Sequence, residues 1–238
     1  MLDNKEIEII KRNMKRFIND NLIVKEKQGK FIDFFMKNSA DSLNSAKLLF
    51  KASTNKELQN YSGFPDFNGF LWVINSSYYS MFYMARALLE SEGIKNTMRH
   101  HGLKAVVCDR RSCLGCSRND RTLKGAVLVK FLDIKIKQEM ESIHLITFDA
   151  LVYYFYLTGK IEKSLIEEFK EAEKEVSETL GKDKARGLIE DYSYERDKRS
   201  RFTYEMGEIA IKNKAETSLN RAMRFNEEIR KIIEFKMK

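Results

Sequence analysis

The sequence predicts an all-α fold built from long helices. Only one of the 238 residues is proline and 11 are glycine, so few sharp turns are expected. Hydrophobic residues make up 43% of the chain and charged residues 33%, which are the proportions of a globular protein. Apolar side chains recur at steps of three and four along most of the chain, as they do in helices that bury one face. These observations predict one helical domain over residues 1–238.

Three helices are predicted in the first half of the chain, over about residues 4–24, 30–51 and 68–91. The clearest loop lies before the third of them and contains Pro65, the only proline. The third helix carries one continuous apolar stripe, formed by Phe70, Ile74, Tyr78, Met81, Ala85 and Leu88. A neighbouring stripe, formed by Tyr79, Tyr83 and Arg86, predicts that this helix contacts other elements on two faces. Gly93 is expected to end it.

The second half is less regular at its start. Residues 99–122 show little apolar periodicity and are predicted to form a loop, whereas residues 123–143 fit either a helix or a strand. Further helices are predicted over 147–157, 162–180, 184–204 and 212–237. Thr147 is a plausible N-terminal cap of the first of these helices, and Gly159 and Gly181 are the expected ends of the first two.

Composition also limits the compartment and the partners. No run of 18 apolar residues is present, so no membrane span is expected, and the N-terminus lacks the apolar stretch of a secretory signal. Three cysteines do not make a disulfide framework, and the cytoplasm is therefore the expected location. A formal net charge of +8 permits an anionic partner such as RNA, DNA or a nucleotide, although lysine-rich surfaces also serve solubility.

A cysteine cluster in the predicted loop is a candidate metal site. Cys108, Cys113 and Cys116, together with His101 of the His100–His101 pair, could supply four ligands to a structural zinc ion. The spacing differs from that of a standard knuckle with two CxxC pairs. The alternative is a reduced loop whose many arginines make the thiols reactive and could contact phosphates.

A second candidate site is the segment 192–206, in which arginines are interleaved with tyrosines. The residues are Arg196, Arg199, Arg201, Tyr192, Tyr194 and Tyr204. Guanidinium groups bind phosphate and tyrosine rings stack on bases, so this pattern is typical of a nucleic-acid contact. The alternative is a surface helix held by ion pairs, because Glu195 lies four residues before Arg199. His144 lies among apolar residues and fits a packed histidine better than a catalyst.

The third predicted helix, SYYSMFYMARALLESEGI from Ser77 to Ile94, resembles the signature helix of HEPN domains. The name abbreviates "higher eukaryotes and prokaryotes nucleotide-binding". The segments SADSLNSAKLLF, RDKRSRFTYEM and KAETSLNRAMRFNEEIRKII resemble other helices of the family and occur in the same order. This resemblance divides the chain into a core, residues 30–100 and 184–238, and a central insertion at about 108–182. Typical members have a much shorter connection there.

The resemblance implies an up-and-down helical bundle, usually homodimeric, that binds a nucleotide or nucleic acid and requires no cofactor. It further implies a toxin–antitoxin-like system with a nucleotidyltransferase partner. The implied binding residues are Arg196, Arg199, Arg201, Tyr204, Tyr79 and Arg86.

The sequence departs from the family at one position. Members with ribonuclease activity place a histidine shortly after an arginine, but here that position is Phe202, which cannot transfer a proton. The His-dependent ribonuclease site is therefore expected to be missing. Two alternatives remain: an active metal-independent ribonuclease toxin that uses His100 or His101, and a protein-interaction module stapled by zinc.

Overall fold

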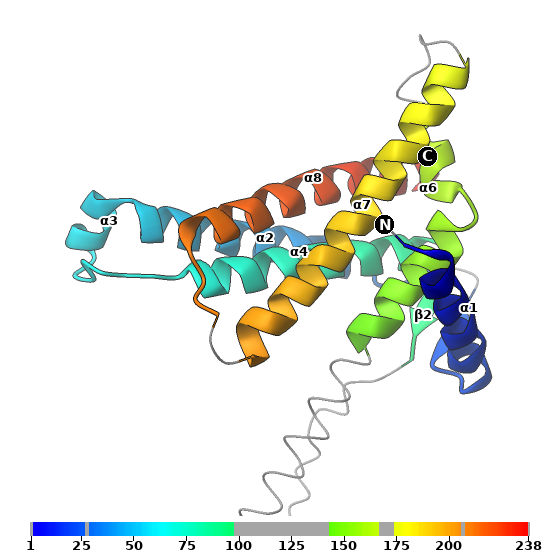
Figure 1. Ribbon diagram of the computed structural model, residues 1–238, viewed down its shortest axis with the longest axis horizontal. Coiled ribbons are helices and arrows are strands. Elements are labelled where there is room, and N and C mark those ends of the chain that lie inside the picture. The colour runs from blue at the N-terminus through cyan, green and yellow to red at the C-terminus, as the bar shows by residue number, and fades with distance from the viewer. Residues whose placement is uncertain (1, 27–28, 98–142, 167–173, 206–207, 238) are drawn as a thin grey trace, which may run out of the picture.

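The structure, a computed structural model, describes residues 2–26, 29–97, 143–166, 174–205 and 208–237 (Figure 1). Helices dominate these residues, and the predicted all-α fold is confirmed. The helices are α1 (Asn4–Asn19), α2 (Ile32–Thr54), α3 (Lys56–Tyr61), α4 (Phe70–Ser91), α6 (Lys160–Ile166), α7 (Lys174–Tyr204) and α8 (Lys212–Met237). A helix at 143–151 continues into the π-helix η1 (Val152–Tyr156). Within the described ranges, no helix combines the length and apolar character needed to cross a membrane.

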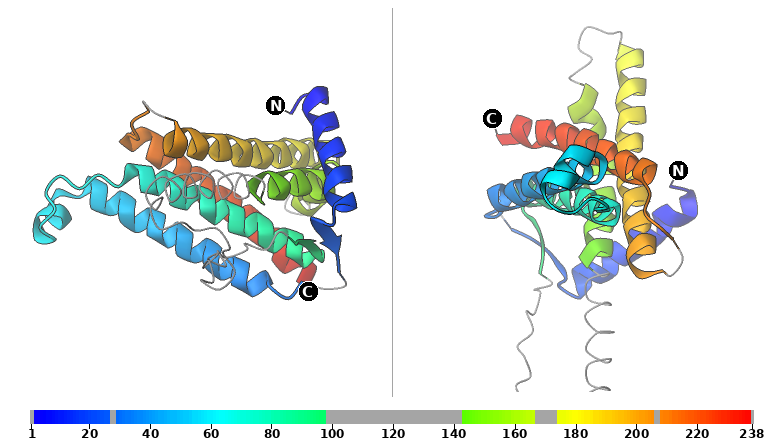
Figure 2. Two further views of the ribbon diagram at one scale, coloured as in Figure 1. Left: turned by 90° about the horizontal axis from the view of Figure 1, so that it is seen from below. Right: turned by 90° about the vertical axis from the view of Figure 1, so that its left-hand side faces the viewer.

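The centre of the bundle is α4, which packs against α2, α7 and α8 (Figures 1 and 2). Its predicted apolar stripe is buried apart from Phe70, which is only partly covered. The neighbouring stripe is half-buried, because Tyr83 stacks on Phe35 of α2 with ring centroids 6.4 Å apart. Arg86 lies over the same Phe35 ring at 4.7 Å. The predicted contacts on two faces of this helix are therefore confirmed.

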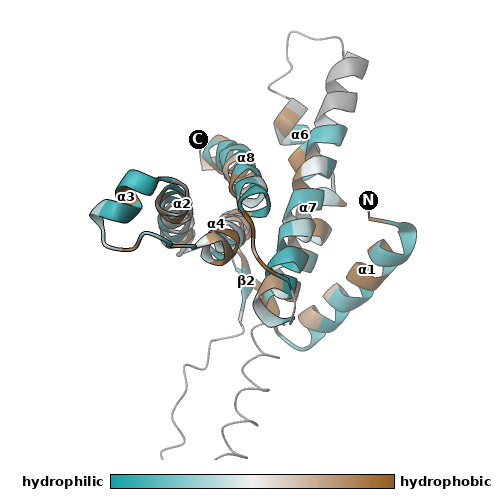
Figure 3. Cartoon of the chain, turned by 60° about the vertical axis from the view of Figure 1, so that its left-hand side comes forward, coloured by the Kyte–Doolittle hydropathy of each residue, from teal (hydrophilic) through white to brown (hydrophobic). Residues whose placement is uncertain are grey.

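The two ends of the molecule differ in character. At one end α1 lies across the helix at 143–151 and α7, as Figure 2 shows. At the other end lies α3, which is short and almost wholly hydrophilic (Figure 3). This short helix interrupts the predicted loop before α4. It begins where Asn55 Oδ1 accepts a hydrogen bond from the Leu58 amide at 2.9 Å.

A small antiparallel strand pair, which the sequence pattern did not predict, connects the segments after α1 and after α4. Strand β1 (Ile23–Lys25) pairs with β2 (Ile94–Asn96), with Ile23 opposite Asn96. The first helix consequently ends at Asn19 and not near residue 24. Gly93 follows α4 as predicted and has a φ of +71°, and a Cβ there would lie 2.0 Å from the carbonyl oxygen of Glu26.

Three predicted helix boundaries in the second half were wrong. Thr147 is not a cap, since it lies buried within the helix at 143–151. Gly181 does not end a helix and Lys184 does not begin one, because α7 runs through both positions to Tyr204. Glycine in a helix costs only about 1 kcal/mol relative to alanine, and packing of α7 against α6 and α4 outweighs that cost. Gly159 has a φ of +67° and marks a helix end as predicted.

Candidate phosphate-binding site around Arg199

Three of the expected binding residues meet where α7 crosses α4. Arg199 Nη2 donates hydrogen bonds to the hydroxyl of Tyr79, at 3.1 Å, and to that of Tyr204, at 2.8 Å. Its guanidinium carbon also lies 5.8, 5.5 and 5.0 Å from the ring centroids of Tyr78, Tyr79 and Tyr204. The cation is thus held by hydroxyl oxygens and by aromatic faces.

The opposite directions of α4 and α7 bring these residues together. Thr203, one turn after Arg199, donates its hydroxyl to Asn75 Oδ1 at 2.9 Å, and Asn75 lies one turn before Tyr79. Successive turns of the two helices therefore meet in reverse order. Tyr204 is the last residue of α7 and reaches Arg199 from the end of the same helix.

The Arg199 guanidinium is buried without a carboxylate partner. The residue is 5% exposed, and no carboxylate of the described residues lies within ion-pair distance of it. Its Nε has no hydrogen-bond partner there. Tyr204 is 39% exposed and Tyr79 half-buried, so both hydrogen-bond partners of Arg199 are themselves in contact with solvent. A buried cation without an opposite charge is unfavourable, and an anion bound here would compensate it.

The ion pair that the spacing of Glu195 and Arg199 suggested does not form. Glu195 is fully buried and accepts from Lys198 Nζ at 3.2 Å and from Arg221 Nη1 of α8 at 2.8 Å. Lys198 also donates to the hydroxyl of Ser218 at 2.8 Å. This network joins α7 to α8 and does not include Arg199, whose hydrogen bonds go to Tyr79 and Tyr204.

The structure places the other three expected binding residues elsewhere: Arg196, Arg201 and Arg86. Arg196 lies over the ring of Phe148 at 4.4 Å and pairs with Asp197 at 3.1 Å. Arg201 pairs at 3.5 Å with Glu208, an exposed residue that follows α7. Arg86 lies on the α2 side of α4, where burial lowers the pKa of its guanidinium. The family resemblance grouped these arginines with Arg199, but in the fold they contact different neighbours.

A histidine from the insertion lies directly beside the tyrosines that contact Arg199. His144 Nδ1 is 2.9 Å from the hydroxyl of Tyr78, and its ring lies 5.7 Å from Tyr79 and 4.6 Å from Phe82 between centroids. The residue is 5% exposed, so the predicted packed histidine is confirmed. Burial raises the pKa of Tyr78 well above its ordinary value, which keeps that hydroxyl neutral. No pattern in the sequence indicated that His144 lies so close to Tyr79.

Phe202 lies in apolar surroundings. It is 7% exposed and belongs to a cluster with Ile74 of α4 and with Ala215 and Leu219 of α8. A histidine at this position would therefore face the interior. Position 202 itself therefore supplies no proton-transfer group where the family resemblance expects one.

The predicted zinc ligands, Cys108, Cys113, Cys116 and His101, lie outside the described residues, as does His100. The zinc site therefore stays a prediction. In the part of the chain that the structure does describe, no group of three or more His, Cys, Asp or Glu side chains is placed to hold a metal ion. No protein-family model matches the chain, and neither a curated protein nor a solved structure matches it.

Proposed function

We propose that the chain is an HEPN-type protein that binds a phosphate of RNA or of a nucleotide through Arg199. The observation that carries this proposal is the buried Arg199 guanidinium, which has two tyrosine hydroxyls but no carboxylate of the described residues within reach. Phosphate fits this environment because it supplies negative charge and accepts hydrogen bonds from a guanidinium fork. The unpartnered Nε of Arg199 is a further donor, but it is buried, so a phosphate oxygen would reach it only when a covering side chain moves aside.

The two tyrosines add to the recognition of a nucleotide. The Tyr79 hydroxyl accepts a bond from Arg199, so its own proton can be donated to a phosphate oxygen. The ring of Tyr204 is partly exposed, and exposed aromatic rings stack on unpaired bases. We therefore assign phosphate binding to Arg199 and Tyr79, and base contact to Tyr204.

Binding without cleavage is the form of this proposal that the residues favour. Phe202 cannot accept or donate a proton, and the imidazole of His144 is buried and bonded to Tyr78. The competing function is a metal-independent ribonuclease in which His100 or His101 acts with an arginine. The family resemblance also implies a homodimer and a nucleotidyltransferase partner in a toxin–antitoxin-like setting, and these belong to the same proposal.

The test is a binding titration with a short fluorescent uridine oligonucleotide, followed by anisotropy, with AMP as competitor. Arg199→Gln removes hydrogen bonds from a charged group, each worth about 1.5–3 kcal/mol, so affinity should fall by about 10- to 100-fold. Arg201→Gln is the matched control, because it removes the same charge from a partly exposed residue paired with Glu208. Its affinity should stay within about twofold of wild type.

Two outcomes would overturn the proposal. In the first, wild type binds neither the oligonucleotide nor AMP. In the second, Arg199→Gln and Arg201→Gln bind alike, with circular dichroism confirming that both are folded. Cleavage of the oligonucleotide that is lost in the His100→Ala, His101→Ala double variant would instead establish the ribonuclease.

A further inference from the structure

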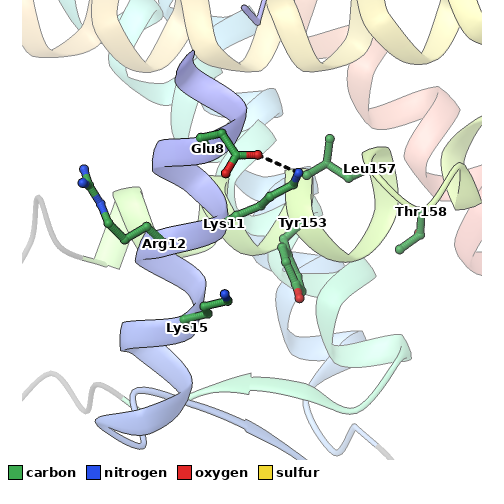
Figure 4. A pocket seen from close by; sticks show the side chains of 7 residues that line it. All are labelled: Glu8, Lys11, Arg12, Lys15, Tyr153, Leu157 and Thr158. Carbon is green, nitrogen blue, oxygen red and sulfur yellow. Dashed lines mark hydrogen bonds and ion pairs between the residues drawn. The ribbon is translucent and has the colours of Figure 1, made fainter. Parts of the chain in front are cut away.

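A basic cleft lies between α1 and η1, in parts of the chain outside the segments that resemble HEPN domains. Its volume is about 450 Å³. Its lining includes Glu8, Lys11, Arg12 and Lys15 of α1, with Tyr153 of η1 and Leu157 just after it (Figure 4). Three cations and one carboxylate give this lining a net positive charge, so it is suited to an anionic ligand.

The cations are not all neutralised within the protein. Lys11 pairs with Glu8 at 2.8 Å, and this hydrogen bond is the main cause of the lowered pKa of the Glu8 carboxyl. Arg12 and Lys15 have no ion-pair partner among the residues that the structure describes. Lys11 and Lys15 are four residues apart, so they project from the same side of α1, and Figure 4 shows both beside Tyr153.

The aromatic wall of the cleft stands on an unusual backbone. At the end of η1 the amide of Leu157 bonds to the carbonyl of Val152, five residues earlier, at 2.8 Å. Turns of this π type are rare and occur frequently at functional sites. The Tyr153 ring makes an edge contact with Tyr154, with centroids 5.2 Å apart, and is half-buried. Tyr153 is thus a positioned ring and not a loose surface side chain.

The helix at 143–151 lies between the helix that carries the cleft and the helix that carries Arg199. On one side Asn13 of α1 donates a hydrogen bond to Asp149 at 2.9 Å. On the other side Arg196, one turn before Arg199 on α7, lies over the ring of the neighbouring Phe148 at 4.4 Å. Both α1 and α7 therefore contact the same short stretch of this helix.

We propose that the α1–η1 cleft is a second contact for the single-stranded RNA that engages Arg199. Lys11 and Lys15 bind backbone phosphates and Tyr153 stacks on a base. This inference rests on the proposed function of Arg199. A single strand is the fitting ligand because only unpaired bases can stack on a protein ring beside a basic track. The central insertion and α1 thereby lengthen the RNA-binding surface beyond the family-like core.

The experiment compares a short and a long uridine oligonucleotide by anisotropy over a salt series. Wild type should bind the long one more tightly. In Lys11→Gln/Lys15→Gln the slope of log affinity against log salt should fall by about 1.4, since each phosphate contact of a single strand contributes about 0.7. Between about 50 and 200 mM salt, the factor by which affinity falls should therefore be about sevenfold smaller in the variant than in wild type. Binding of the short oligonucleotide should not change.

Three further variants sharpen the test. Lys37→Gln/Lys51→Gln makes the same charge change at exposed positions of α2 and should match wild type in slope. Tyr153→Leu should weaken binding of the long oligonucleotide only. Glu8→Gln should strengthen binding of the long oligonucleotide, because Lys11 then loses the carboxylate that neutralises its charge.

The outcomes separate this inference from the proposed function. If binding depends on Arg199 but the Lys11/Lys15 variant equals the Lys37/Lys51 control, the cleft does not bind RNA, and the role of Arg199 stands. The same conclusion follows if wild type binds long and short oligonucleotides equally. If Arg199→Gln has no effect on either oligonucleotide, the proposed function fails and this inference fails with it.

Discussion

Asp149 offers a direct test of how α1 is joined to the rest of the molecule. The residue is 2% exposed, and its carboxylate accepts a hydrogen bond from Asn13 Nδ2 of α1 at 2.9 Å. Burial raises the pKa of this carboxyl from 3.8 to about 6, although the Asn13 hydrogen bond and the charges of Arg196 and Arg16 oppose the shift. We predict that the change in the free energy of unfolding caused by Asp149→Asn is more favourable at neutral pH than in acid.

The magnitude follows from the shift. A change of about two pKa units corresponds to about 3 kcal/mol at about 1.36 kcal/mol per unit. Well below pH 3.8 the carboxyl is protonated in both the folded and the unfolded chain, so ionisation carries no penalty. As the pH rises towards about 6, the unfolded chain ionises first and the folded state loses stability relative to it. An amide at this position stays neutral throughout and keeps an acceptor for Asn13.

Urea unfolding followed by circular dichroism, at about pH 7.5 and about pH 4, measures the effect on both proteins. Any packing difference between an amide and a protonated carboxyl is the same at both pH values. The stability difference should change by about 2.5 kcal/mol in favour of the variant at the higher pH, because the unfolded wild type is already partly ionised at the lower one. Asp66→Asn, at an exposed loop position, should change stability by no more than about 0.5 kcal/mol at either pH. A stability difference for Asp149→Asn that is equal at both pH values would refute the reasoning.

Two further predictions concern the fold around the candidate site. Phe202→His should not create RNA cleavage and should lower the free energy of unfolding by about 2–3 kcal/mol, because it buries an imidazole among apolar side chains; cleavage assays and urea unfolding check both parts. Gly93→Ala should lower the melting temperature much more than Gly63→Ala. Both glycines have a positive φ, which costs alanine about 1–2 kcal/mol, but only at Gly93 would the new Cβ also meet a backbone oxygen, that of Glu26. Equal losses of melting temperature in the two alanine variants would contradict this.

The part of the site that lies on one helix was predictable from the sequence. The part that depends on which face of each helix packs against its neighbours was not. Arg199 and Tyr204 lie on one predicted helix, so their neighbourhood followed from local spacing. Arg201 is two residues from Arg199, which turns it by about 200° to another face of α7. Arg196 is one turn away but contacts the helix at 143–151, because Phe148 lies there. Which face meets which neighbour is decided by packing, and the sequence pattern does not contain it.

The same reason explains the features that the pattern missed. The β1–β2 pair joins residues that lie far apart in the chain, and three-residue strands carry too little periodicity to be seen. The α1–η1 cleft brings Lys11 to Tyr153 across a still longer stretch of chain. Gly181 predicts a helix end because glycine is locally unfavourable in helices, but packing along α7 outweighs that preference.

By itself, the sequence determined that the protein is helical, where most helices lie and which of their faces are apolar, because these properties depend on residues three and four apart. It also determined that position 202 cannot supply a proton. Only the tertiary structure decided that Arg199 is buried between Tyr79 and Tyr204, and that His144 lies beside them. Those contacts join α4, α7 and the insertion, and their geometry is set by how the helices pack and not by any local pattern.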